Sequence, residues 1–205
     1  VYVGDAFGVS HRAHASNSIV PTFFKNKRFM GFLMEKELEY LCSITKNPLS
    51  PFTAIIGGVK VSDKIGVLLS ILDKIDNLII GGAMAYTFVS YFKGSVGSSL
   101  VEKNQEKTIK DICCAAKKNN VQLILPIDSV NAKENSASSP VCVSDIKNIP
   151  SGYMGLDIGE KSLSLFSKVI AGSSTIMWNG PMGVFEKVAF ENGTRGVARA
   201  IVNAT

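Results

Sequence analysis

A short apolar run that ends in two glycines and passes into a lysine-bearing helical segment occurs at residues 54–64. Its core, Ile55–Gly58, recurs as Ile79–Gly82. Each copy has the layout of a buried strand that enters a helix through a tight turn, because glycine has no Cβ to block a sharp change of direction. Two such units in succession are typical of βαβ crossovers, which join parallel strands. The recurrence therefore predicts an α/β fold built on a parallel sheet.

Strands and helices are expected to alternate through the chain after Pro51. The apolar patterns predict strands at residues 53–56, 77–80, 121–126, 141–143 and 175–178. They predict helices at residues 65–75, 85–92, 102–119 and 161–171, and a last helix that runs to the end. Residues 128–140 and 150–157 are polar or rich in turn formers, and we interpret them as loops. Hydrophobic residues make up 46% of the sequence, which is enough for a sizeable core.

The segment before Pro51 has a different character. Residues 1–3 resemble the middle of a strand, and the sequence has neither an initiator Met nor a signal-like start, so we expect a fragment of a longer protein. Apolar residues at helical spacing predict an amphipathic helix over residues 29–44. The helix breakers in Asn47–Pro51 make this the best candidate for an internal boundary.

Three glycine-rich turns follow predicted strands, at residues 57–58, 81–82 and 179–183. In an open parallel sheet such turns meet at the carboxyl edge, where ligands bind. Lys60 and Lys64 would share one face of a helix, and a helix that began near Ser62 would offer free N–H groups to an anion. The pattern favours a phosphate site, although solvated lysines and ordinary α/β turns would explain the same residues.

Composition and motifs exclude several classes of protein. The formal net charge is +5 and the basic residues are dispersed lysines without interleaved aromatics, which favours small phosphorylated ligands over nucleic acid. No segment approaches the roughly 20 apolar residues of a membrane span. Four cysteines without Cys-x-x-Cys spacing predict buried, reduced thiols in a cytosolic protein. There is no P-loop motif, and residues 81–86 lack the full Gly-x-Gly-x-x-Gly spacing of a dinucleotide site.

Six segments, in the same order, resemble signature motifs of the phosphoglycerate kinase family. They lie at residues 3–14, 31–38, 57–64, 80–85, 154–157 and 178–186 and are spread over nearly the whole chain. The resemblance implies a three-layer α/β/α, Rossmann-like parallel sheet in a nucleotide-binding domain at residues 29–205. Residues 1–28 would be the remnant of an N-terminal α/β phosphoglycerate-binding domain and the linker. A monomeric, cytoplasmic enzyme of glycolysis with no nucleic-acid or membrane partner is implied.

The family transfers a phosphoryl group between 1,3-bisphosphoglycerate and ADP, giving 3-phosphoglycerate and ATP, with Mg²⁺ as cofactor. The resemblance implies that Arg12 binds phosphoglycerate with the help of His11 and His14. It implies that Lys64 binds the nucleotide phosphates and that Lys60 follows the transferring phosphoryl group. Arg12, Lys60 and Lys64 are therefore the implied catalytic residues. The implied nucleotide-binding residues are Gly57, Gly58, Lys60, Lys64, Gly81, Gly82, Gly155, Leu156, Asn179, Pro181, Gly183 and Glu186.

Two parts of the family pattern have no counterpart in this sequence. The family's N-terminal half is missing before Val1, and its Gly-Gly-Gly-Asp-Thr loop, which supplies the Mg²⁺ ligand, is missing after Thr205. We therefore expect no metal ligand in this chain and keep two hypotheses. The chain is part of a phosphoglycerate kinase or, taken alone, a nucleotide-binding module without turnover. A dehydrogenase domain is the third and weakest alternative, because the glycine spacing disfavours it.

Overall fold

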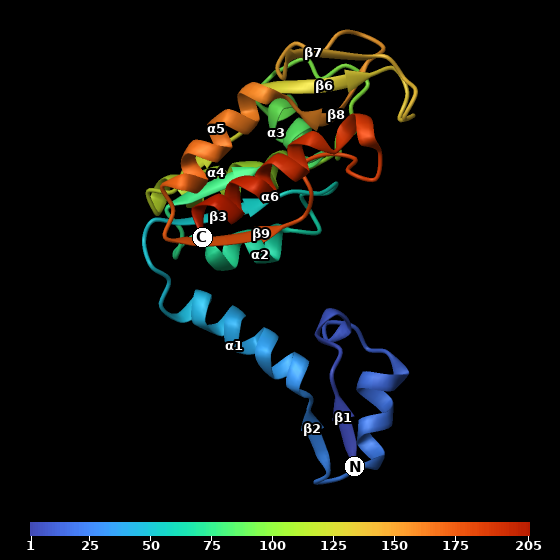
Figure 1. The fold of residues 1–205 in the computed structure, drawn as a ribbon, viewed down its shortest axis with the longest axis vertical. Coiled ribbons are helices and arrows are strands. Elements are labelled where there is room, and N and C mark those ends of the chain that lie inside the picture. The colour runs from blue at the N-terminus through green and yellow to red at the C-terminus, as the bar shows by residue number, and fades with distance from the viewer. The chain divides into compact units, whose positions relative to one another are not determined.

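The computed structural model describes the backbone of all 205 residues and every side chain except those of Ser43 and Thr45. The chain divides into two compact units, Val1–Pro48 and Leu49–Thr205 (Figure 1). This division falls inside the predicted breaker Asn47–Pro51 and not after Arg28, where the predicted domain boundary lies. In the part of the chain that is described, no helix is both long and apolar enough to cross a membrane.

The first unit combines a two-stranded parallel sheet with one long helix. Strands β1 (Tyr2–Gly4) and β2 (Arg28–Met30) pair in register, and helix α1 spans Phe32–Lys46. Three short helical turns lie between the strands, at Phe7–Val9, Ala15–Ile19 and Val20–Phe23. The predicted helix over 29–44 thus begins three residues late, because residues 28–30 pair with β1 instead. Asp5 fixes the start of α1, since its Oδ1 accepts the Met34 N–H at 2.8 Å.

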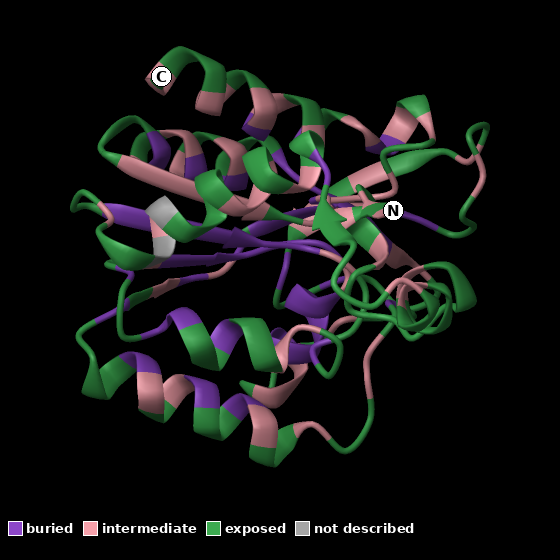
Figure 2. Cartoon of the chain, turned by 90° about the horizontal axis from the view of Figure 1, so that it is seen from below, coloured by how far each residue is buried: buried purple, intermediate pink, exposed green. Residues whose placement is uncertain are grey.

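The second unit is built on a four-stranded parallel sheet of order β5-β4-β3-β9. These strands are β3 (Phe52–Ile56), β4 (Asn77–Ile80), β5 (Gln122–Ile124) and β9 (Thr175–Asn179). The helices are α2 (Ile65–Ile71), α3 (Met84–Tyr91), α4 (Glu106–Lys118), α5 (Glu160–Ala171) and α6 (Asn192–Ala204), with a short turn at Val188–Phe190. Figure 2 shows buried strands between layers of helices, which confirms the predicted three-layer α/β arrangement.

Alternation along the strands explains the layers. Successive residues of a strand point to opposite faces of its sheet. Ile55 and Ile79 pack in one cluster with Phe166 of α5 and Val197 of α6, so these two helices cover one face. All five residues of β3 are buried, as expected for a central parallel strand.

A second, antiparallel sheet of order β7-β6-β8 was not predicted. It consists of β6 (Asp128–Ala132), β7 (Val141–Asp145) and β8 (Met154–Ile158), so the interpretation of 128–140 and 150–157 as loops was wrong for β6 and β8. The polar residues of β6 led to this wrong prediction, because polar residues are usually exposed but these are buried and form hydrogen bonds. Asp128 accepts the N–H groups of Lys161 and Ser162 at the start of α5.

The four cysteines are half-buried or exposed, which corrects the expectation of buried thiols.

Candidate nucleotide and anion sites

The three glycine-rich turns meet at one edge of the four-stranded sheet. The Gly57 N–H donates to the Asn179 carbonyl at 2.9 Å, and the Gly82 N–H donates to the Met182 carbonyl at 3.1 Å. Gly82 has a φ of +65°, and a Cβ on it would lie 2.5 Å from the Gly58 nitrogen. Backbone therefore packs directly on backbone here, an approach that a side chain at Gly82 would prevent.

A pocket of about 260 Å³ opens beside these turns, entirely within the second unit. Six of the residues implied in nucleotide binding line it: Gly58, Gly82, Gly155, Leu156, Pro181 and Gly183. Eight further residues complete the lining: Val59, Ala83, Tyr86, Leu100, Asn135, Met154, Met182 and Val184. The wall is mostly apolar with a few polar groups, which suits a flat heterocyclic ring.

Gly57 and Gly81, two of the residues implied in nucleotide binding, pack against the third glycine-rich turn and do not line the pocket. A Cβ on Gly57 would lie 2.1 Å from the Pro181 carbonyl, and one on Gly81 would lie 2.3 Å from the Met182 sulfur. Neither glycine is among the lining residues. Their role in the structure is to let the turns pack together. Glu186 is exposed and also lies outside the lining.

The lysine-bearing turn differs from its predicted geometry. Helix α2 begins at Ile65 with Lys64 as its N-cap residue, so Lys60 and Lys64 do not share a helix face. Lys64 Nζ donates to Asn179 Oδ1, which ties the first glycine-rich turn to the third. The Ser62 N–H, predicted to be free for an anion, donates to Glu102 Oε2 at 3.1 Å. A carboxylate of the protein therefore uses this donor.

The floor of the pocket rests on a buried tyrosine. Tyr86 is 4% exposed, and its hydroxyl lies 2.8 Å from Ser129 Oγ in β6. Burial raises the pKa of Tyr86 far above its usual range, so the hydroxyl stays protonated and available for this bond. Gly155 packs on the ring, and a Cβ there would lie 2.2 Å from Tyr86 Cζ. The Gly155 N–H donates to Ser99 Oγ at 2.9 Å, which holds β8 against the pocket.

A buried carboxyl group supports the third turn from below. Asp157 is 1% exposed, and its carboxyl oxygens accept the Ile158 N–H at 2.9 Å and the Gly193 N–H at 2.7 Å. A Cβ on Gly183 would lie 2.3 Å from Asp157 Oδ1. Burial raises the pKa of Asp157 to about 7, although the two hydrogen bonds oppose the shift. The group therefore changes charge near neutral pH while it supports the third glycine-rich turn and the start of α6.

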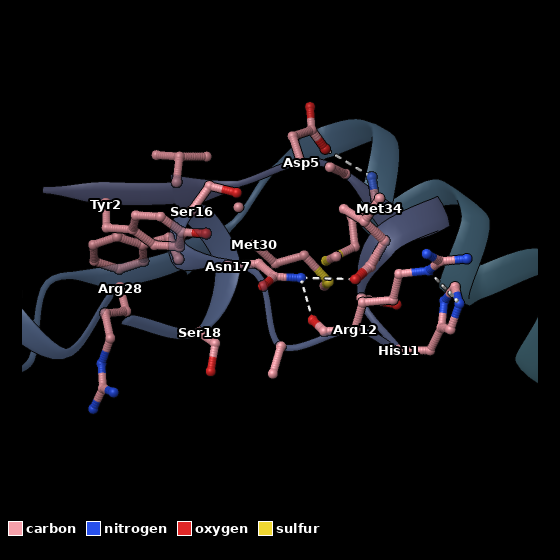
Figure 3. A pocket seen from close by; sticks show the side chains of 17 residues that line it. Tyr2, Asp5, His11, Arg12, Ser16, Asn17, Ser18, Arg28, Met30 and Met34 are labelled. Atoms are coloured by element: carbon pink, nitrogen blue, oxygen red, sulfur yellow. Dashed lines mark hydrogen bonds between the residues drawn. The ribbon is translucent and has the colours of Figure 1, made fainter. Parts of the chain in front are cut away.

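The first unit contains a separate, more polar pocket of about 750 Å³ (Figure 3). His11 and Arg12 line it, as the resemblance implies, together with Arg28 from β2. The Arg12 Nε donates to His11 Nε2 at 3.3 Å, drawn as a dashed line in Figure 3. His11 Nε2 is the acceptor in this bond. Arg12 and Arg28 both line this pocket, and a guanidinium group suits a phosphate or carboxylate ligand.

His14 lies outside this pocket lining and caps the helical turn Ala15–Ile19 instead. Its side chain accepts the Asn17 N–H, and the His14 N–H donates to Asn17 Oδ1 at 2.9 Å. The Asn17 amide also donates to the carbonyls of Val9 and Arg12, at 2.7 and 2.9 Å. Asn17 thus braces the loop that carries Arg12, a role that no sequence motif indicated.

Among the described residues, no group of three or more His, Cys, Asp or Glu side chains is placed to hold a metal ion. The residues present therefore do not fit a metal site formed by the protein alone. Mg²⁺ commonly binds through substrate phosphates with only one or two carboxylates. A reaction that uses Mg²⁺ therefore does not require such a cluster.

Comparison with known proteins gives consistent matches along the whole chain. The family model described as "Phosphoglycerate kinase" matches residues 1–205. The phosphoglycerate kinase of Thermosipho africanus is 48% identical over 206 residues, and that of Clostridium novyi is 46% identical over 204 residues. Each match covers 100% of this chain and 51% of the relative. The chain thus spans about half the length of these curated relatives.

Solved structures give the same picture. The structure of phosphoglycerate kinase from Coxiella burnetii matches with a TM-score of 0.88 and 39% identity, covering 99% of this chain and 52% of that one. The crystal structure of the enzyme from Pyrococcus horikoshii matches with a TM-score of 0.80 and 26% identity, covering 98% of this chain and 51% of that one.

Proposed function

This chain belongs to the phosphoglycerate kinase family, and we propose that it works as part of a longer enzyme. That enzyme would transfer a phosphoryl group reversibly from 1,3-bisphosphoglycerate to ADP, giving 3-phosphoglycerate and ATP in the cytoplasm. One observation supports this proposal most strongly. Three glycine-rich turns meet beside a pocket, and six of the residues implied in nucleotide binding line that pocket.

The nucleotide would bind to the second unit with its base in the 260 Å³ pocket. Gly155 and Tyr86, which pack on each other, form part of the pocket wall, and Pro181 and Leu156 provide apolar contacts. The phosphates would extend toward Lys60 and Lys64, with Asn179 holding Lys64 in place. Glu186 would accept the ribose hydroxyl groups from its exposed position.

The phosphoglycerate would bind to the pocket of the first unit. Arg12 offers a planar guanidinium for bidentate bonds to phosphate or carboxylate, and its bond to His11 would orient it. His14 would help from the same loop, which its contacts with Asn17 brace.

Catalysis would rest on position and charge, without a covalent enzyme intermediate. A phosphoryl group in transfer spreads negative charge over its oxygens, and Lys60 would follow and stabilise that charge while Lys64 holds the nucleotide phosphates. Bound Mg²⁺ would neutralise further phosphate charge. The described residues of this chain supply no carboxylate cluster for it, so we derive no step through the metal.

The test is a coupled, ATP-dependent assay of the full-length protein that contains this sequence, with 3-phosphoglycerate as acceptor. We expect turnover with 3-phosphoglycerate and none without an acceptor. A folded protein without activity on 3-phosphoglycerate would refute the proposal.

The role assignment makes a sharper prediction in the same assay. Lys64→Ala removes a charge-assisted bond to the nucleotide phosphates, so it should lower kcat/KM for ATP by roughly 10- to 100-fold. Arg12→Ala should mainly lower kcat/KM for 3-phosphoglycerate. Lys74→Ala, which changes an exposed lysine just after α2, is the matched control and should leave both unchanged. Equal effects of the first two variants on both substrates would contradict the assignment.

A second candidate function applies to the 205-residue chain alone. The nucleotide pocket is lined only by residues of the second unit, so this unit would bind ADP without completing the reaction. Titration calorimetry of the chain with ADP should show weak binding and no turnover. The absence of any ADP binding would exclude this nucleotide-binding module.

A further inference from the structure

A short segment between α3 and α4 touches both ends of the proposed nucleotide site. Ser99 accepts the Gly155 N–H at 2.9 Å, beside the base pocket, and Leu100 lines that pocket. Two residues later, Glu102 reaches the lysine-bearing turn through Ser62. Residues 99–102 therefore connect the wall of the base pocket to the turn that carries Lys60 and Lys64.

The Glu102 carboxylate holds that turn with two bonds to one residue. Its Oε2 accepts the Ser62 N–H at 3.1 Å, and its Oε1 accepts the Ser62 hydroxyl. The Glu102 backbone is itself anchored, because its N–H donates to Thr87 Oγ1 at 3.1 Å, and Thr87 is only 3% exposed in α3. The carboxylate is thus fixed from both sides, to a packed helix and to the turn.

Charge supports the same arrangement. Burial by itself would raise the pKa of Glu102, but bonds from Ser62 and Val61 and the nearby charge of Lys60 outweigh it and lower the pKa. Glu102 is therefore ionised at neutral pH. The negative charge of Glu102 and the positive charge of Lys60 attract each other.

Ser62 stands two residues from each of the two lysines. Val61, the residue before it, is fully buried, and its carbonyl accepts the Lys64 N–H at 3.0 Å. The turn between Lys60 and Lys64 is thus fixed at Val61 by packing and at Ser62 by Glu102. Without the carboxylate, the donors of Ser62 would lose their partner, and the lysines would lose a fixed backbone.

We propose that Glu102 is a positioning residue that acts through Ser62 to aim Lys60 and Lys64 at the phosphates of the bound nucleotide. The inference rests on the proposed function, since it assumes a nucleotide in the pocket beside the turn. Glu102 touches no part of that nucleotide. Its effect is therefore confined to ligands that carry phosphates and need the lysines.

Comparing ADP with adenosine separates positioning from a merely structural role, because adenosine fills the base pocket but carries no phosphate. The experiment measures the Kd of both ligands by calorimetry on the full-length protein and on its Glu102→Gln variant. Gln keeps the shape but loses the charge, and its single carbonyl oxygen can accept from only one of the two Ser62 donors. We expect ADP to bind roughly tenfold more weakly to the variant. Adenosine should bind equally well to both.

Two further variants complete the design. Glu106→Gln removes an exposed carboxylate in the first turn of α4 and should leave both affinities unchanged. Ser62→Ala should weaken ADP binding as well, and combining it with Glu102→Gln should add little, because both variants break the same link. Amide hydrogen exchange of residues 59–64 without nucleotide should be faster in Glu102→Gln than in the wild type.

Three outcomes would contradict the role of Glu102, and a fourth would contradict the proposed function. Unchanged ADP affinity in Glu102→Gln would overturn the inference, and so would an equal loss of ADP and adenosine affinity, which would indicate general damage to the fold. Fully additive effects of Ser62→Ala and Glu102→Gln would also contradict it. A wild-type protein that binds neither ligand would refute the proposed function itself, a result distinct from the other three.

Discussion

Replacing Asp157 by asparagine tests whether the carboxyl group under the third glycine-rich turn is neutral in the folded protein. The side chain is 1% exposed, and burial raises its pKa from the ordinary 3.8 to about 7. Between these two values the folded protein holds a proton that the unfolded chain has released. Stability from this group therefore falls as the pH rises from about 4 to about 7 and is constant above that range.

The size of the effect follows from the two pKa values. Each pH unit inside the window costs up to about 1.4 kcal/mol, so the total loss between pH 5 and pH 8 is about 2.5 kcal/mol. The side-chain amide of the Asp157→Asn variant does not titrate, and it replaces one acceptor oxygen by an NH₂ group that would face the N–H of Ile158 or Gly193. That mismatch should cost about 1–3 kcal/mol at every pH. The constant offset and the slope can therefore be told apart.

The assay is urea unfolding of wild type and Asp157→Asn at pH 5, 6, 7 and 8. Trp178, the single tryptophan of the sequence, lies in β9 of the same unit and reports the transition by fluorescence. We expect the wild type to lose about 2.5 kcal/mol relative to the variant as the pH rises. Asp73→Asn, at an exposed aspartate, should run parallel to the wild type. A constant difference between wild type and Asp157→Asn would refute the raised pKa, and so would a slope of opposite sign.

Three further predictions test the packing of the second unit. Gly155→Ala should weaken ADP binding roughly tenfold in calorimetry, because its Cβ would collide with the Tyr86 ring, which the bond to Ser129 holds in place; unchanged affinity would show that the ring yields. Gly66→Ala in α2 should stabilise the protein by about 0.5–1 kcal/mol in urea unfolding, because its Cβ would meet no atom within 4 Å. Phe166→Ala should cost about 3–5 kcal/mol in the same measurement, since this side chain is fully buried in α5; a loss below about 1 kcal/mol would contradict its place in the core.

The parallel sheet was predictable because its signal is local. A strand such as β3 is buried on both faces and reads as a continuous apolar run, and Gly57-Gly58 marks its end. The antiparallel sheet was not predictable in this way. Strand β6 carries Asp128 and Asn131 among its buried residues, and their partners in α5 and β7 lie far along the chain.

The candidate site divides in the same manner. Gly58 and Gly82 were found from the spacing of strand and turn, and both line the pocket. Tyr86 lies one helical turn after Gly82, so its spacing offered a weak signal for the pocket floor. Asn135 offered none, because the fold brings it to the pocket wall from a segment that follows the unpredicted strand β6.

The lysine-bearing turn depends both on its local sequence and on a contact from a distant segment. The local pattern places Lys60 and Lys64 after a tight turn that follows a buried strand, because apolar runs and glycines act through short-range sterics. The partners of the hydrogen-bond donors in this turn depend on long-range contacts, which the local pattern does not contain. A helix starting at Ser62 would have left them free, but Glu102 lies within reach and accepts them. Helix α2 starts at Ile65, and the turn before it is held by a residue 40 positions away from Ser62.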